Sequence, residues 1–402
     1  MTVVGPPAYL SRTAIAMLAL AAGVAIANGY ALQPSLSAIA GDFGVSAARM
    51  ATLASVTMLG YLAGLALLVP LVDRFGPRTL IPAQMGGGLA VLLACASLSS
   101  TPLALDTCFV LVGAATTVAA QCSAVVGKHA EPRRRGAAMG VVSAGISAGI
   151  LLSRFVGGAL SQWCGWRGAL LALAGCVALA AVGSGVLLPG GRPERRSGHA
   201  ATIGAIPRLL RDSAALRRRT GAGMLWFFAF NLVWVGLAIR LAAPPYSMGA
   251  AAIGAYSLAG VLGLGVTRVA GKLTDRFGDR AVIGWGLAVA ALSTLLLGVA
   301  LGHPGWLGVG LAWFDAGCFA AQVANQARVV AIQPARAGAL SAAYLTLYYA
   351  AGAGGAVAAG MLVERIGWGA MMFVAAIALA AAGWVGAARV SVDASGEPTS
   401  AG

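Results

Sequence analysis

The chain has 402 residues, of which 59% are hydrophobic and 10% charged, and its 27 basic and 12 acidic side chains give a formal net charge of +15. A soluble domain carries about a quarter charged residues, so this composition excludes an ordinary soluble protein. The positive charge does not indicate a nucleic-acid-binding protein, because the basic residues lie mostly in short segments between long apolar runs.

Twelve apolar runs are long enough to cross a membrane, since a transmembrane helix takes roughly 20 mostly apolar residues. Short segments of alternating polarity, which are typical of a membrane β-barrel, do not occur. The sequence therefore predicts an all-α membrane protein. We expect its spans near residues 13–33, 49–69, 79–99, 102–126, 136–160, 167–188, 220–242, 250–270, 281–301, 305–328, 338–361 and 367–388.

The basic residues are distributed unequally between the two sides of these spans. Only Arg49, Arg167, Arg240 and Arg365 fall near one face, and most of the others fall on the opposite face. The positive-inside rule then predicts that both termini are cytoplasmic. The first apolar run is long and has no evident processing site, so we expect no cleavable signal peptide.

Polar side chains occur inside the first and fourth spans. Such groups need hydrogen-bond partners, so they should face a cavity or another helix rather than lipid. Two interpretations stay open, a substrate-cavity wall and hydrogen bonding between helices. The residues concerned are Asn28, Tyr30, Gln33 and Gln121.

Arg154 lies within the fifth span, among closely spaced glycine and serine residues. Burying a lone guanidinium costs about 2.5 to 3.5 kcal/mol even on lenient scales, so Arg154 needs a counter-charge, carbonyl groups or water. Asp106, near the outer end of the antiparallel fourth span, lies at a matching depth and is one predicted partner. Asp315 in the tenth span is the alternative.

A polar stretch follows the sixth span and separates two halves of similar length. It is too short for a catalytic domain and too polar to insert into a membrane, so we interpret it as a linker. We expect an N-terminal six-helix bundle over 1–189, a cytoplasmic linker over 190–219, a C-terminal six-helix bundle over 220–390 and a cytoplasmic tail over 391–402.

The second half carries further polar and aromatic residues inside its spans. Span seven has a group of polar and aromatic residues that suit either packing or a cavity wall: Trp226, Phe227, Phe230, Asn231 and Trp234. Asp315 is the only acid predicted near the middle of the bilayer, and an intramembrane carboxylate is a functional candidate because burial disfavours its ionised form. It could instead be a structural counter-charge for Arg154. The same region adds Gln322, Asn325, Gln326, Tyr344 and Tyr348.

Cysteine and histidine residues do not form a recognisable site. Six cysteines and three histidines are present, and neither type has metal-ligand spacing. No nucleophile and base occupy recognisable positions. We therefore expect no metal, no cofactor and no enzymatic activity.

Two charged turns, about half a chain length apart, share one pattern. Val69 to Arg78 reads VPLVDRFGPR, and Gly271 to Arg280 reads GKLTDRFGDR. Recurrence of this kind indicates a duplicated membrane protein, and Asn231 follows Asn28 at nearly the same offset. The predicted fold is therefore twelve transmembrane helices in two pseudo-symmetric six-helix bundles.

The second turn matches in full the loop signature G-x-L-x-D-R-x-G-x-R of the major facilitator superfamily, which the chain resembles over nearly its whole length. The first turn lacks only the opening glycine. The resemblance implies the major facilitator fold and transport by alternating access around a cavity lined by spans one, four, seven and ten. The matching residues are Gly271, Leu273, Asp275, Arg276, Gly278 and Arg280, and Leu71, Asp73, Arg74, Gly76 and Arg78.

Other segments resemble a bacterial efflux-type, drug:proton antiporter-like branch. They include Asn28-Gly-Tyr30, the run from Gly149 to Gly158, and Asp315 with Asn325-Gln326. Ser153-Arg154 stands where the antiporter signature of span five has Gly-Pro. The resemblance implies a monomer in the bacterial inner (plasma) membrane, with protons, a small organic molecule and the lipid bilayer as its partners.

These observations predict proton-coupled efflux, with Asp315, Arg154 and Asp106 as the residues of proton coupling. The polar and aromatic residues named above would line the substrate cavity. The charged turns would act as gates, because Asp73 can cap the positive amino-terminal end of span eleven and Asp275 that of span five. Three alternatives remain: proton-coupled uptake, uniport, and a transport-derived sensor.

Overall fold

The computed structural model describes residues 9–131, 133–190, 206–261, 265–266, 269, 273–274, 276–333 and 336–388. These residues form helices and connecting turns, with no strand among them. Nine of the described helices are long and apolar enough to cross a membrane, and two shorter apolar helices accompany them. The longest helix contains two predicted spans, and each of the twelve predicted spans contains described helical residues, so the predicted fold class is confirmed.

The N-terminal half follows the predicted order of spans, with short helices between the first two. Its elements are α1 (Arg12–Ala27), η1 (Gln33–Ser35), α2 (Leu36–Phe43), α3 (Ala47–Met50), α4 (Thr52–Leu67), η2 (Val69–Asp73), α5 (Pro77–Leu98), α6 (Pro102–Ala115), α7 (Val118–His129) and α8 (Arg135–Leu187). Within α8 the backbone leaves helical geometry at Gly165 (φ 71°, ψ 165°), which separates the fifth and sixth spans. A left-handed φ of this kind favours glycine.

The C-terminal half begins with a short helix and then repeats the plan. Its elements are α10 (Ile206–Asp212), α11 (Ala214–Ala242), α12 (Ala250–Ala255), η3 (Tyr256–Gly260), α14 (Asp279–Val299), α15 (Pro304–Ile332), α16 (Ala337–Arg365) and α17 (Gly367–Ala387). In both halves the first and fifth spans pack together, as α1 with α8 and as α11 with α16. This recurrence of one helix pairing is the arrangement expected of two equivalent bundles.

Small residues allow these helix pairs to approach closely. A Cβ atom at Gly145 of α8 would meet the backbone of Ala19 in α1, and a Cβ at Gly355 of α16 would meet the backbone of Phe228 in α11. Glycine at such positions lets helix backbones pack within a membrane, where no hydrophobic force drives helices together. Large apolar side chains are exposed on the outside of the molecule, among them Trp163, Leu179 and Val299.

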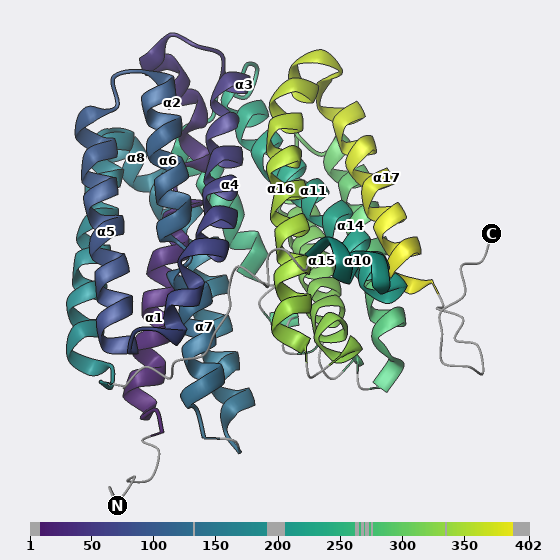
Figure 1. Cartoon of the computed structure of the whole chain (residues 1–402). Helices are drawn as coiled ribbons and strands as arrows, with labels where there is room; N and C mark the ends of the chain where they lie inside the picture. Colours follow the sequence, from purple (N-terminus) through teal and green to yellow (C-terminus); the bar gives the residue numbers. More distant parts are fainter. Residues whose placement is uncertain are drawn as a thin grey trace, which may run out of the picture.

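The two halves meet along α4 with α16 and along α8 with α12. The Ser55 hydroxyl of α4 donates to the Ala353 carbonyl of α16 (2.8 Å), and the Ser257 hydroxyl of η3 donates to the Leu151 carbonyl of α8 (2.9 Å). In Figure 1 the ribbons of the two halves approach near α3 and the upper end of α16, and they separate toward α7 and α15. The halves are therefore closed together at the end that carries α2 and α3.

Candidate functional site

Arg154 lies at the junction of the two halves, and its side chain is 2% exposed. Its Nε donates to Oε1 of Gln33 (2.9 Å), which belongs to η1 of the same half. The guanidinium carbon lies 4.6 Å from the ring centroid of Trp234, 5.0 Å from that of Tyr30 and 5.8 Å from that of Phe230. Since Trp234 and Phe230 belong to α11, aromatic rings from both halves surround one cation and stabilise it through their π faces.

Asp315 is the fully buried acid of α15, on the C-terminal side of the same junction. Its Oδ1 accepts a hydrogen bond from Nε1 of Trp234 (3.1 Å). A Cβ atom at Gly260 would meet Oδ2 of Asp315 and the side chain of Leu151, so the carboxylate packs against η3 where that segment faces α8. Trp234 thus contacts both charged groups, with its ring under the guanidinium and its indole N–H on the carboxylate.

The hydrogen bonds of this cluster are incomplete. Among the described residues, no partner lies within hydrogen-bond distance of Nη1 or Nη2 of Arg154, of Nε2 of Gln33, or of Oδ2 of Asp315. A buried charged group without a full set of partners costs several kcal/mol. An arrangement this costly, formed from both halves, is where ligand or proton binding is expected to occur.

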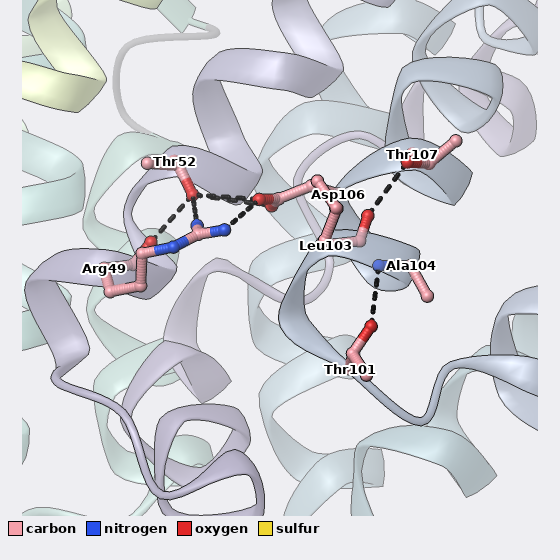
Figure 2. Close-up of polar contacts among 7 residues, drawn as sticks. All are labelled: Arg49, Thr52, Thr101, Leu103, Ala104, Asp106 and Thr107. Carbon is pink, nitrogen blue, oxygen red and sulfur yellow. Dashed lines mark hydrogen bonds and ion pairs between the residues drawn. The ribbon is translucent and has the colours of Figure 1, made fainter.

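The predicted pairing of Asp106 with Arg154 is wrong. Oδ2 of Asp106 lies 2.7 Å from Nη2 of Arg49, and both Asp106 oxygens lie near the hydroxyl of Thr52, as Figure 2 shows. Arg49 also donates to that hydroxyl. The match in depth between Asp106 and Arg154 did not take account of α3, which brings Arg49 closer. Asp106 therefore links α6 to the start of α4. The acid of the Arg154 cluster is Asp315.

Asn28 and Asn231 have the same environment in the two halves. Nδ2 of Asn28 donates to the Val24 carbonyl (3.0 Å), and Nδ2 of Asn231 donates to the Phe227 carbonyl (2.9 Å), four residues earlier in each case. Both Oδ1 atoms are buried without a partner in the described part of the chain. The likeness agrees with their predicted equivalence. At Asn28 the first helix has ended at Ala27, before the predicted limit of its span, so Tyr30 and Gln33 lie in a break in the helix.

The predicted aromatic residues of span seven form one group with those of span eleven. Tyr348 lies 5.4 Å from Trp226 and 5.5 Å from Tyr344 between ring centroids. Trp226 lies 5.9 Å from Phe230, which connects this group to the Arg154 cluster. Phe227, predicted on the same helix face as Phe230, stacks on Tyr348. Further members were not predicted as site residues, among them Phe314 and Tyr349, which flank predicted ones.

The amides of span ten divide into two groups. The Tyr344 hydroxyl donates to Oε1 of Gln322 (3.0 Å), and Nδ2 of Asn325 donates to that hydroxyl (3.4 Å) and to the Arg219 carbonyl (2.9 Å). Gln326, in contrast, is exposed. Gln121 of α7 also lies away from the Arg154 cluster, because its Nε2 donates to the Leu68 carbonyl (2.8 Å) and to the side chain of Gln84.

One ion network at the other end of the C-terminal half was not predicted. Nη2 of Arg219 lies 2.8 Å from Oδ2 of Asp279, and Nε of Arg328 lies 3.4 Å from the same oxygen. Nη1 of Arg219 donates to the Gly386 carbonyl (3.0 Å). Asp279 occupies the variable position of the second charged turn, where the first turn has Pro77. This sequence difference between the two turns is the feature that could have indicated the ion network.

The charged turns are described only in part, because Gly271 and Asp275 lie outside the described residues. Asp73 forms an ion pair with Lys128 of its own half. The N-cap residue of α16, Arg336, makes no side-chain capping hydrogen bond, and the predicted contact of Asp73 with span eleven stays a prediction. In the first turn Arg74 is exposed, Gly76 precedes α5, and Nε of Arg78 donates to the Gly185 carbonyl. In the second turn the guanidinium of Arg276 lies over the Phe277 ring, and Gly278 (φ 83°) and Arg280 follow.

Two helical bundles that meet at a buried ionic and aromatic cluster define a polytopic membrane protein of the transporter class. Residues 18–356 match the family model described as Major Facilitator Superfamily, and the chain belongs to this family. It is 32% identical to the putative uncharacterized transporter YgaY of Escherichia coli (strain K12), over 90% of this chain and 92% of that protein. It is 33% identical to the probable transporter SCO4007 of Streptomyces coelicolor, over 92% and 86% respectively.

A solved structure supports the same fold. The human organic anion transporter MFSD10 (TETRAN) superposes with a TM-score of 0.70 at 16% identity, covering 95% of this chain and 100% of that one. At such identity the likeness concerns the fold alone. The family match and the relatives named as transporters show a multi-pass membrane transporter rather than an enzyme.

Proposed function

We propose that the chain moves a small organic molecule across the bacterial inner membrane by alternating access, and that protonation of Asp315 couples this movement to the proton gradient. The observation that carries the proposal is the placement of Asp315 and Arg154 on opposite halves without a direct hydrogen bond between them. A proton that binds or leaves at this position changes the attraction between the halves themselves.

The physical step is electrostatic. When Asp315 is ionised, the guanidinium of Arg154 attracts it across the junction, which favours the conformation in which the halves are closed near α2 and α3. When a proton neutralises Asp315, this attraction is lost and the halves separate there more easily. On the predicted topology, in which both termini are cytoplasmic, the closed end is the outer end and this conformation is inward-facing. Each chain contains both halves, and we take the monomer as the transporting unit.

Efflux is the direction that the span-five and span-ten segments favour through their resemblance to the antiporter-like branch. In this scheme Asp315 binds a proton from outside, and one conformational change carries that proton inward. The reverse conformational change carries the substrate outward. Proton-coupled uptake is the second candidate, and one observation favours it: Arg154 retains unpaired hydrogen-bond donors beside Asp315. A substrate that binds to those donors would bind together with a proton rather than in exchange for one.

The test is flux in vesicles of defined orientation. A substrate found by ligand-dependent thermal shift is added to inverted vesicles whose interior is acidified, so that the gradient has its natural sense. Accumulation in these vesicles, and its loss when the gradient is collapsed, is the result expected for efflux. Accumulation in right-side-out vesicles instead would establish uptake. Stoichiometric binding without flux in either orientation would refute transport and favour a sensor.

A further inference from the structure

We propose that the substrate is a small organic monoanion with an apolar or aromatic body, and that its carboxylate binds to the terminal nitrogens of Arg154. This inference rests on the proposed transport function and specifies the class of its substrate. It is carried by an excess of buried hydrogen-bond donors over acceptors at the junction of the two halves.

The donors can be counted atom by atom. Nη1 and Nη2 of Arg154 and Nε2 of Gln33 are all buried without a partner among the described residues, and each carries two N–H groups. The unpaired acceptors on the same segments are Oδ2 of Asp315 and the amide oxygens Oδ1 of Asn28 and Asn231, so six N–H groups exceed three oxygens. A ligand that satisfies such a cluster must bring acceptors. A carboxylate brings two oxygens in the planar arrangement that a guanidinium binds in bidentate fashion.

The chain itself shows how an arginine with a purely structural role is paired. Arg219 places Nη2 2.8 Å from Asp279, and Arg49 places Nη2 2.7 Å from Asp106. Arg154 is more deeply buried than either, yet its terminal nitrogens have no such partner. Asp315 instead uses one oxygen for Trp234 and turns the other toward Gly260. The guanidinium is therefore held in position by Gln33 while its binding edge remains unused.

The surroundings specify the rest of the ligand. Rings of Trp234, Tyr30 and Phe230 lie within 5.8 Å of the guanidinium carbon, so an anion bound there has aromatic surface beside it. These rings come from both halves. A ligand held among them enters only when the halves part at this junction, and it contacts both when they close. This is the geometry that alternating access requires of a substrate site.

Binding of an anion at Arg154 is linked to the proton on Asp315. The charged and titratable groups that face Asp315 are Arg154 on α8, Tyr30 beside that guanidinium, and Cys318 on its own helix, while α11 offers Trp234 and η3 offers Gly260. An ionised Asp315 competes with the substrate for one cation. Protonated Asp315 removes this competition, so the proton and the anion bind together, and binding weakens by up to about tenfold per pH unit once Asp315 ionises. This linkage belongs to the second candidate above, proton-coupled uptake, so an anionic substrate at Arg154 favours uptake over efflux.

The first experiment is a thermal shift measurement on the purified full-length chain with matched probes. The probes are benzoate, phenylacetate and lactate, their uncharged amides benzamide, phenylacetamide and lactamide, and the cation benzylamine. We expect at least one carboxylate to raise Tm by about 2 °C or more at millimolar concentration, with a smaller effect at higher pH. Its amide and benzylamine should leave Tm unchanged. Stabilisation by amides or benzylamine but not by carboxylates, or by no probe, would overturn the proposal.

Variants locate the effect. Arg154→Gln should abolish the carboxylate shift, and Arg154→Lys, which keeps the charge without the bidentate edge, should retain a weaker one. Asp315→Asn should keep the shift and lose its pH dependence. Arg240→Gln removes an arginine at the end of α11 and should behave as the wild type. A full shift in Arg154→Gln would refute the site, and unchanged pH dependence in Asp315→Asn would refute the competition.

Flux separates this proposal from the proposed function. Proton-driven flux of a neutral or cationic compound that requires Asp315 would leave the transporter mechanism in place and refute the anionic substrate. Binding of a carboxylate that requires Arg154, without flux in proteoliposomes, would support the anion site and refute the proposed transport function.

Discussion

Replacement of Asp315 by asparagine should uncouple transport from the proton gradient, and the structure sets the size of the effect. Among the described residues the buried acids are Asp106 and Asp315, and Asp106 is neutralised by Arg49 at 2.7 Å. This leaves one exchangeable proton. One proton crossing a gradient of one pH unit releases about 1.4 kcal/mol, which supports an accumulation ratio of about ten. The Asp315→Asn protein should reach a ratio of about one.

The assay is accumulation of a labelled substrate in proteoliposomes, with the membrane potential clamped at zero and a gradient of about one pH unit imposed. Exchange at equal concentrations on both sides is measured in the same preparation, and it should persist in Asp315→Asn because that process needs no driving force. Asp106→Asn is the matched control, since it makes the same change at the other buried acid and should retain the tenfold ratio. Gradient-driven accumulation by Asp315→Asn would refute the coupling mechanism.

Three further changes test other parts of the molecule. Asp73→Asn should lower flux several-fold with normal membrane insertion, because the turn loses a charge proposed to close the gate; normal flux would remove that role. Gly145→Leu should lower Tm by about 5 °C or more, since its Cβ would meet the Ala19 backbone. Gly140→Leu, in open space on the same helix, should leave Tm unchanged. Equal effects of the two changes would contradict the close packing of α1 and α8. Asp279→Asn should lower Tm measurably, because the buried Arg219 would lose its counter-charge, and an unchanged Tm would show that the network contributes little.

The fold could be predicted because its determinants are local in the sequence. The length of each apolar run fixes a span, and the repeated turns around Asp73 and Asp275 reveal the duplication without any knowledge of packing. Even the break in the first span has a local origin, since Asn28 and Gly29 are poor helix formers and Pro34 lacks an N–H. The residue types of the site could be predicted for the same reason, because charged and amide side chains inside a span are rare.

The pairing of those residues could not be predicted in the same way. A depth along a helix gives one coordinate, whereas an ion pair also depends on how each helix is rotated and on what the connecting segment contributes. Asp106 and Arg154 match in depth, but the short helix α3 brings Arg49 to Asp106. Likewise, nothing in the spacing of Arg219 and Arg328 indicates that Asp279 binds both. Hydropathy selects the candidates, and packing decides between them.

The unused edge of Arg154 explains how one cluster can serve both coupling and substrate binding. A guanidinium that was fully paired with Asp315 would hold the two halves together irrespective of ligand, as the Arg219 and Asp279 pair holds its own bundle. Because Trp234 takes one oxygen of Asp315 and contacts the face of Arg154 at the same time, the acid and the base remain close without neutralising each other by a direct bond. A proton on Asp315, or an anion on Arg154, then changes the electrostatic attraction between the halves at the surface where they must separate.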